Sequence, residues 1–267
     1  MTRLSTCAAL LAVLSACGGG GGGENDELQL RFATPDTPRE AFSSLGQSVI
    51  ATTDEDGNIT EIQIGGRSFS GDAVSEENAN SSRQDIADML RAVAAGEVAQ
   101  DFLLDNETLN NAAFGLVSDD PLTADAFAFG VPTPSQNVPT AGEATYSGRT
   151  IGTGIDDGVT QFAFTGDVRI HANFATGAFN ADLTDFETRA VQPGDTVPSI
   201  PDLSGSGFLS DGDYTVGLAD DDGGVPDWLG SADGRLFGPN GEETAGVWSA
   251  QNVAQDIVVE GAFGASR

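Results

Sequence analysis

The sequence predicts a mainly β protein, in which an antiparallel β-barrel of about eight strands follows a smaller α+β region. From residue 112 onward, apolar residues recur at every second position in one segment after another. This period of two is typical of strands with one buried face. The apolar faces mix glycine with large side chains, as the limited interior of a small closed barrel requires. The 39% hydrophobic content and 15 Phe supply a core despite a net charge of -30.

The first 27 residues are predicted to be an export signal followed by a flexible tether. The apolar run from Cys7 to Leu14 is shorter than the roughly 20 residues that span a bilayer and fits an export signal over residues 1–16. Leu14-Ser15-Ala16-Cys17 resembles the lipobox of bacterial lipoproteins, which implies that Cys17 is lipidated. The alternative is an ordinary signal with an incidental cysteine. Residues 17–27 then form a lipidated Cys and a Gly-rich tether.

Residues 28–110 are predicted to form a smaller region with a hairpin and a helix. Residues 48–64 contain two alternating runs around Asp56-Gly57-Asn58, and Asp-Gly between such runs indicates a hairpin. Residues 81–97 have apolar positions at helical spacing, which predicts a helix with one packed face.

The ends of this helix have capping residues. Ser82 suits the N-cap, and Asp85, three residues later, is a weaker version of the capping box. Gly96 suits the position just beyond the C-terminus. The apolar face is formed by Ile86, Met89, Leu90 and Val93.

Residues 111–267 are predicted to form the barrel. In residues 161–174 the even positions from Phe162 to Phe174 form an apolar face, while the odd positions are polar except Ala163. The other expected strands are 113–117, 143–153, 178–186, 205–209, 229–237, 244–249 and 257–263. An outer-membrane barrel would place apolar residues toward lipid and leave a polar lumen. Here the opposite face carries Asp, Arg, His and Asn, so the sequence favours a soluble barrel on a tether.

The last strands carry a family resemblance. Residues 234–251 and 259–267 resemble the barrel domains of transferrin-binding protein B-like surface lipoproteins. The matching positions are Phe237, Gly238, Pro239, Asn240, Glu242, Glu243, Gly246, Val247, Gly261, Phe263, Gly264 and Ala265. The resemblance covers roughly 112–267 and implies a scaffold displayed on the outer membrane that binds iron-carrier proteins, haem proteins or other partners. The chain departs from the larger members because it has room for one lobe only and contains no Lys.

The residues offer little support for catalysis or for a cofactor. With 41 acidic residues against 11 basic ones, the chain is unsuited to nucleic acid. The single His171 stands without a Gly-x-Ser-x-Gly elbow, and zinc sites need several Cys or His. The aspartates at 211, 213 and 220–222 do not have the spacing of an EF-hand, so solvated acidic loops are expected. The sequence therefore predicts a protein that is not an enzyme, and it does not support a haem, iron or calcium site.

Two long segments between strands, 190–204 and 219–230, are the expected places for binding. Trp228 lies in the second and is the one candidate partner-binding residue, since Trp is enriched in binding hot spots. Its alternative role is a core or rim-plugging residue at the start of the next strand. The predicted function is a lipid-anchored, surface-exposed binding module for an unknown protein or a haem or iron carrier. The alternatives are a lipocalin-like carrier of a small ligand inside the barrel and an envelope structural protein.

Overall fold

The computed structural model describes most of the chain beyond residue 40. The described residues are 41–43, 49–53, 59–64, 67–70, 82–97, 101–105, 109–120, 123–220, 225–252 and 254–267. The predicted signal, Cys17 and the tether lie outside them. Within these ranges no helix is both long enough and apolar enough to cross a membrane.

Eight antiparallel strands close into a barrel, which confirms the predicted fold class. They are β8 (Glu143–Asp156), β9 (Thr160–Asn173), β10 (Ala178–Ala190), β11 (Leu203–Ser210), β12 (Asp213–Asp220), β13 (Trp228–Phe237), β14 (Glu243–Asn252) and β15 (Ile257–Ser266). Each strand pairs with the next along the chain, and β15 pairs with β8 to close the barrel. The result is an up-and-down barrel without free sheet edges.

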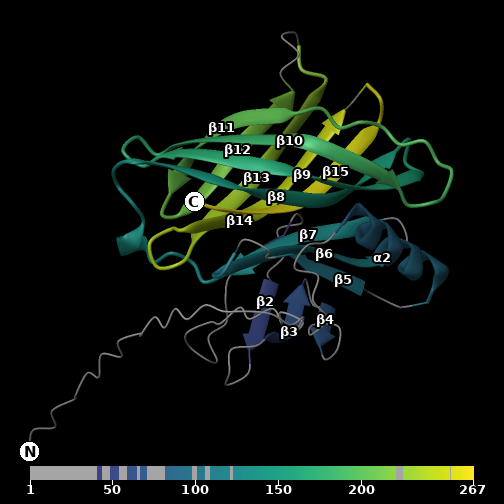
Figure 1. Cartoon of the computed structure of the whole chain (residues 1–267), viewed down its shortest axis with the longest axis horizontal. Coiled ribbons are helices and arrows are strands. Elements are labelled where there is room, and N and C mark those ends of the chain that lie inside the picture. Colours follow the sequence, from purple (N-terminus) through teal and green to yellow (C-terminus); the bar gives the residue numbers. More distant parts are fainter. Residues whose placement is uncertain are drawn as a thin grey trace, which may run out of the picture.

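The N-terminal region forms two further layers beside the barrel (Figure 1). A four-stranded sheet, in the order β1-β7-β6-β5, lies next to the barrel wall, and a three-stranded sheet of β2, β3 and β4 lies beyond it. Their bounds are β1 (Ala41–Ser43), β2 (Val49–Thr53), β3 (Ile59–Ile64), β4 (Arg67–Ser70), β5 (Asp101–Asp105), β6 (Ala112–Asp120) and β7 (Thr123–Gly130). Strands β2 and β3 pair antiparallel, as the predicted hairpin requires, although its turn lies outside the described residues. A short 3-10 helix (Ser135–Asn137) lies between β7 and β8.

Two expectations about the barrel strands are wrong. The segment 113–117, expected to open the barrel, belongs to β6 and pairs with β5 and β7 in the separate sheet. Its side chains are buried on both faces, because the barrel covers one face of this sheet. The barrel is instead completed by β12, for which no strand was predicted and whose terminal residues Asp213 and Asp220 were expected in solvated acidic loops. Its signal is the alternation of Tyr214, Val216 and Leu218, which the flanking aspartates obscure.

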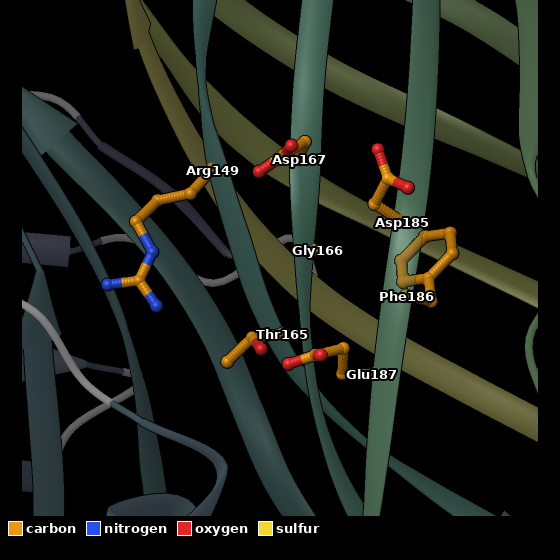
Figure 2. A pocket seen from close by; sticks show the side chains of 7 residues that line it. All are labelled: Arg149, Thr165, Gly166, Asp167, Asp185, Phe186 and Glu187. Atoms are coloured by element: carbon orange, nitrogen blue, oxygen red, sulfur yellow. The ribbon is translucent and has the colours of Figure 1, made fainter.

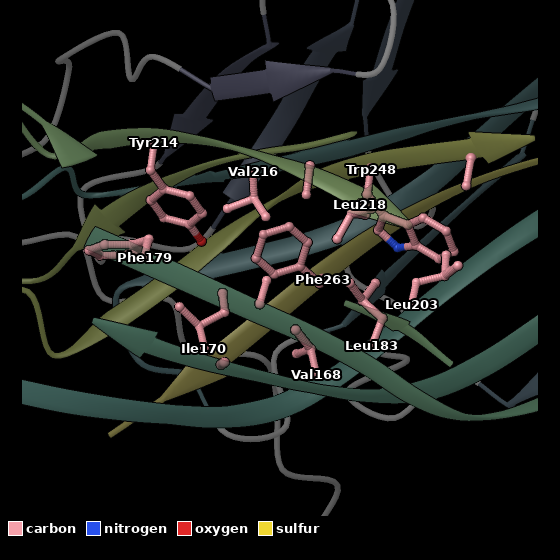
Figure 3. Close-up of a cluster of buried hydrophobic side chains, with 14 of the residues drawn as sticks. Val168, Ile170, Phe179, Leu183, Leu203, Tyr214, Val216, Leu218, Trp248 and Phe263 are labelled. Atoms are coloured by element: carbon pink, nitrogen blue, oxygen red, sulfur yellow. The ribbon is translucent and has the colours of Figure 1, made fainter. Parts of the chain in front are cut away.

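Inside the barrel, large side chains such as Tyr214, Trp248 and Phe263 form a hydrophobic cluster (Figure 3). Several of its aromatic residues lie directly opposite glycines on neighbouring strands. The pairs are Phe162 with Gly154, Phe164 with Gly152, Tyr214 with Gly234, Trp248 with Gly261 and Phe263 with Gly246. At Gly152, a Cβ would lie 2.1 Å from Phe164 Cζ and 2.3 Å from the Glu260 carbonyl oxygen. The predicted mixture of glycine and large residues therefore fills the interior pair by pair.

A β-bulge in β10 brings the aromatic ring of Phe186 into this core. The pairing of β10 with β9 shifts register between Thr184 and Glu187, so two residues of β10 face one residue of β9. Phe186 turns inward at this place and packs edge-on against Phe164, with ring centroids 5.7 Å apart. Gly166 leaves the space for it, since a Cβ there would lie 2.9 Å from Phe186 Cδ1.

Helix α2 (Arg83–Ala95) begins and ends as the sequence predicts. Ser82 and Asp85 form a reciprocal capping box, and Gly96 adopts a left-handed conformation with φ 70°. The buried face packs into a second core that contains side chains from β6, β7 and the outer barrel wall. From the helix it includes Ile86, Ala87, Met89 and Leu90.

The expectation that all odd positions of 161–174 except Ala163 face water is wrong at the start of β9, where helix α2 and the second core lie against the strand. Ala163 is fully buried and Gln161 is 8% exposed, because the second core covers the start of β9. Farther along the strand, Asp167, Arg169 and His171 are exposed as predicted.

Candidate functional site

The motif that carries the family resemblance joins the barrel to the N-terminal region. Glu243, the first residue of β14, is 2% exposed. Its carboxylate accepts hydrogen bonds from the backbone N–H groups of Asn110 and Asn111, both at 2.8 Å, and from Asn111 Nδ2 at 2.9 Å. A buried carboxylate needs such donors to offset its desolvation. The Glu-Glu part of the motif is therefore a structural clamp.

The Gly-Pro-Asn turn before this clamp is held by Glu242 and by the end of the chain. Asn240 donates to the Glu242 carboxylate from its backbone N–H at 2.9 Å and from Nδ2 at 2.7 Å. Burial alone would raise the pKa of Glu242, but these hydrogen bonds and the charge of Arg267 hold it below its usual value. Tyr146 donates to the carbonyl of Gly241 at 2.7 Å, and burial raises the pKa of Tyr146 to about 12. The turn thus forms a packed closure at this end of the barrel.

The two ends of the barrel differ in their connections. We call the end with the longer connections the loop rim: in the described part of the chain it consists of residues 157–159, 191–202, 225–227 and 254–256 and the adjoining strand ends, which include Trp228, Leu229 and Val258. The opposite end, the turn rim, consists of residues 174–177, 211–212 and 238–242 together with the C-terminus marked in Figure 1. The described residues of the two segments expected to carry binding, 190–204 and 219–230, lie at the loop rim. A rigid barrel that presents such connections at one end is a suitable scaffold for recognition.

The structure buries the predicted binding residue Trp228 at the loop rim. Its side chain is 4% exposed and belongs to the barrel core. Its backbone N–H donates to Asp220 Oδ1 at 3.1 Å, and that aspartate is itself 6% exposed. This placement corresponds to the rim-plugging role that the sequence left as the alternative. A direct contact of Trp228 with a partner stays a prediction.

The loop rim carries exposed apolar residues that were not predicted from the sequence. Among the described residues, Val225 is 91% exposed, Val159 73%, Leu229 53% and Val258 45%. Val258 and Leu229 occupy the outward positions of alternating strands, where a polar residue is expected. That break in the alternation was the available signal.

One pocket of about 420 Å³ lies on the outer wall, beside the bulge (Figure 2). It is lined by Arg149, Thr165, Gly166, Asp167, Asp185, Phe186 and Glu187. Arg149 Nη1 lies 2.9 Å from Oδ2 of the fully buried Asp105 on β5, and Glu187 Oε2 lies 2.5 Å from Arg83 Nη1 on α2. Two of its charged groups therefore connect the barrel to the N-terminal region, which is a structural role.

A second pocket of about 650 Å³ lies between helix α2 and the loop rim. It is lined by Asp88, Arg91, Ala92, Ala94, Ala95, Glu97 and Gln192. Arg91 Nη2 lies 2.5 Å from Asp88 Oδ1. Because Gln192 belongs to the β10–β11 connection, the C-terminal part of α2 adjoins the loop rim.

The remaining candidates provide no catalytic arrangement. His171 lies on the exposed face of β9, with Nδ1 3.4 Å from Thr145 Oγ1 and Nε2 4.0 Å from Glu143 Oε2. Asp213 pairs with Arg235, and Asp220 accepts backbone hydrogen bonds. In the part of the chain that the structure describes, no group of three His, Cys, Asp or Glu side chains could hold a metal ion.

The sequence and the fold both have known counterparts. Residues 138–267 match a family model described as the C-lobe and N-lobe β-barrels of transferrin-binding protein B. This range includes all eight barrel strands. A comparison with curated proteins gives no match.

Three solved structures share the fold. A transferrin-binding protein B variant from Haemophilus parasuis Hp5 is 15% identical, with a TM-score of 0.55, over 86% of this chain and 45% of that chain. The isotype 1 protein from serogroup B Neisseria meningitidis is 16% identical, with a TM-score of 0.55, over 87% and 44%. The apo haemoglobin receptor HpuA from Kingella denitrificans is 14% identical, with a TM-score of 0.51, over 89% of both chains. The chain thus spans less than half the length of the transferrin-binding proteins that it matches.

Proposed function

Residues 138–267 form a β-barrel domain of the transferrin-binding protein B type, and from this premise we propose that the chain is a non-enzymatic binding module for a macromolecular partner. The partner class that we propose is an iron-carrier or haem protein. The single observation that supports this most is the combination of a closed barrel of this family with an N-terminal sheet and helix packed on its wall. The similar folds include proteins named for binding transferrin and haemoglobin.

The carrier alternative is less well supported by the packing. A lipocalin-like carrier needs an interior cavity of a few hundred Å³. Here the barrel interior holds a contiguous set of buried side chains, including Trp248, Phe164 and Phe263, each less than 2% exposed. Both pockets described above lie outside the barrel. Binding by the outer surface is the simpler function for this arrangement.

The anchoring of the module is part of the same proposal. Export directed by residues 1–16, lipidation of Cys17 and a glycine-rich tether over 17–27 would hold the protein at the outer membrane, with the barrel outside the cell. A Cys17→Ala variant tests this: the protein should move from the membrane fraction to the soluble fraction of the envelope. Equal membrane association of both forms would contradict a lipid anchor at this residue.

Surface display and binding are tested separately. Protease added to intact cells should remove the barrel, whereas survival of the full-length protein until lysis would contradict display. For binding, the purified chain is immobilised and exposed to haemoglobin and to iron-loaded transferrin, with serum albumin as the control. Saturable binding of one carrier and not of albumin is the expected result, and failure of both carriers would remove this partner class.

A further inference from the structure

We propose that the loop rim binds a protein surface whose apolar centre is surrounded by lysine and arginine side chains. This inference rests on the proposed function, for which it names the contact surface and the chemistry of the partner. Exposed apolar side chains, strand register and charge at one end of the barrel support it.

The exposed apolar side chains gather at this rim. Of the five large hydrophobic residues that are strongly exposed in the described ranges, Val159, Val225, Leu229 and Val258 belong to it. The fifth, Phe208, lies near the other end of β11, three residues before the β11–β12 turn. Scattered single apolar residues are normal on a protein surface, whereas a group at one place marks an interaction site.

The strand register places two of these residues, Leu229 and Val258, in one row on the outer wall. Leu229 pairs with Gln251, Gln251 with Val258, and Val258 with Ile155. Directly opposite residues on neighbouring strands share a face, so Leu229 and Val258 lie two strand spacings, about 10 Å, apart. The row continues at Ala219, which pairs with Leu229.

The charge around this row has one sign. The described connections of the loop rim contain no Arg, and the chain has no Lys. The one Arg next to a strand end of the described rim, Arg189, is on β10, which does not contribute to the row. The described aspartates of these connections and strand ends are Asp156, Asp157, Asp195, Asp202, Asp220, Asp227 and Asp256, and none of these forms an ion pair with an arginine in the described structure. At the turn rim, by contrast, Asp213 pairs with Arg235, and Arg267 lies close enough to Glu242 to affect its pKa.

Helix α2 extends the negative region next to the rim. Its last turn has no basic residue, so the partial negative charge of the helix C-terminus is not offset there. Glu97 and Asp88 line the pocket that α2 shares with Gln192 of the rim, and Arg91 is already paired with Asp88.

The negative charge of the loop rim favours some classes of binding partner over others. A second copy of the chain carries a net charge of -30 and would be repelled, as would nucleic acid or an anionic membrane surface. A basic protein surface is attracted, and its apolar centre would cover the Leu229–Val258 row. The arrangement of an apolar centre and a charged margin is that of an ordinary protein interface.

The test uses the purified full-length chain and a probe of the proposed chemistry. The probe is an 18-residue amphipathic helix of leucine and lysine, and the same peptide with glutamate in place of lysine is its counterpart. Leu229→Asp and Val258→Asp remove the apolar row, and Phe208→Asp is the control because it adds the same charge at an exposed apolar position away from the rim. The rim variants should weaken binding of the lysine peptide by about tenfold or more, while the control should bind as the wild type or more tightly.

A second set of variants tests the charges without changing the backbone. Asp157, Asp256 and Asp211 all have positive φ, of 51°, 52° and 53°, which asparagine tolerates. Asp157→Asn with Asp256→Asn at the loop rim should slow association and reduce its salt dependence, and Asp211→Asn at the turn rim should not.

The outcomes separate this inference from the proposed function. Equal loss in Leu229→Asp and Phe208→Asp, equal binding of the glutamate peptide, or no binding of the lysine peptide would overturn the loop rim as a site for basic partners. If haemoglobin and transferrin both fail while the lysine peptide binds at the rim, the carrier proposal falls and the rim stands. If a carrier binds the rim variants as well as the wild type, the function stands and the rim does not.

Discussion

Asn111 and Glu243 lie 132 positions apart in the sequence and share two hydrogen bonds that fasten the N-terminal region to the barrel. The backbone N–H of Asn111 donates to Oε2, and its Nδ2 donates to Oε1, so the buried carboxylate is held from both sides. Asn111 immediately precedes β6, and Glu243 begins β14. The pair therefore fixes where the four-stranded sheet meets the barrel wall.

Glu243→Gln should destabilise the protein because the amide brings an NH2 group to a site where three N–H donors already point. A buried donor without an acceptor costs about 1–3 kcal/mol. The measurement is chemical unfolding followed by tryptophan fluorescence. Glu242→Gln is the neighbouring control, whose carboxylate is only partly buried, and equal effects of the two substitutions would contradict the clamp.

Arg149→Met should be more costly, because it leaves the fully buried carboxylate of Asp105 without the guanidinium 2.9 Å away. Loss of one partner of a buried ion pair costs about 3–5 kcal/mol. Adding Asp105→Asn should recover part of this loss in unfolding measurements. A double variant that is as unstable as the sum of both single variants would show that the pair is not coupled.

Gly152→Ala should disturb the barrel core, because its Cβ would lie 2.1 Å from Phe164 Cζ. Overpacking of this kind costs about 1–3 kcal/mol or prevents a stable fold. Gly217→Ala is the matched control on β12, where an added Cβ meets no atom within 4 Å. Its stability should be unchanged or higher by up to about 1 kcal/mol.

The two tyrosines of the chain should resist ionisation until the protein unfolds. Burial raises the pKa of Tyr146 to about 12, and burial also raises that of Tyr214, which shares a hydrogen bond with Thr244. Since the folded state disfavours tyrosinate, this stabilisation is complete below pH 10 and is lost as pH rises from about 10 toward 12. As the pH is raised, the absorbance of tyrosinate should therefore appear over the same pH range in which the near-ultraviolet circular dichroism is lost. Ionisation of either tyrosine near pH 10 in the folded protein would contradict its burial.

Ser82→Ala should lower stability by about 1 kcal/mol through loss of the N-cap of helix α2. The Ser82 side chain accepts from the backbone N–H of Asp85, and the Asp85 carboxylate accepts from the backbone N–H of Ser82 at 2.8 Å. Gln84→Ala, within the first turn but outside the cap, is the control. Thermal unfolding of both variants provides the comparison.

Sequence reasoning was most reliable where the information is local. The alternation along β9 predicts a strand with one apolar face, and Ser82, Asp85 and Gly96 predict both ends of helix α2, because capping and side-chain period depend on neighbouring residues. The mixture of glycine and aromatic residues also predicts a small closed barrel. These signals fix the elements but not the partners of each element.

The amino-acid sequence alone determined the barrel class, the caps of the helix, the acidity of the chain and the absence of lysine. Only the tertiary structure decided that β6 leaves the barrel for a second sheet, that β12 takes its place and that Trp228 points inward. It also decided that Leu229 and Val258, 29 positions apart in the chain, lie in one exposed row at the loop rim. The reason is that strand pairing and burial arise from contacts between distant segments, which a local pattern of side chains does not specify.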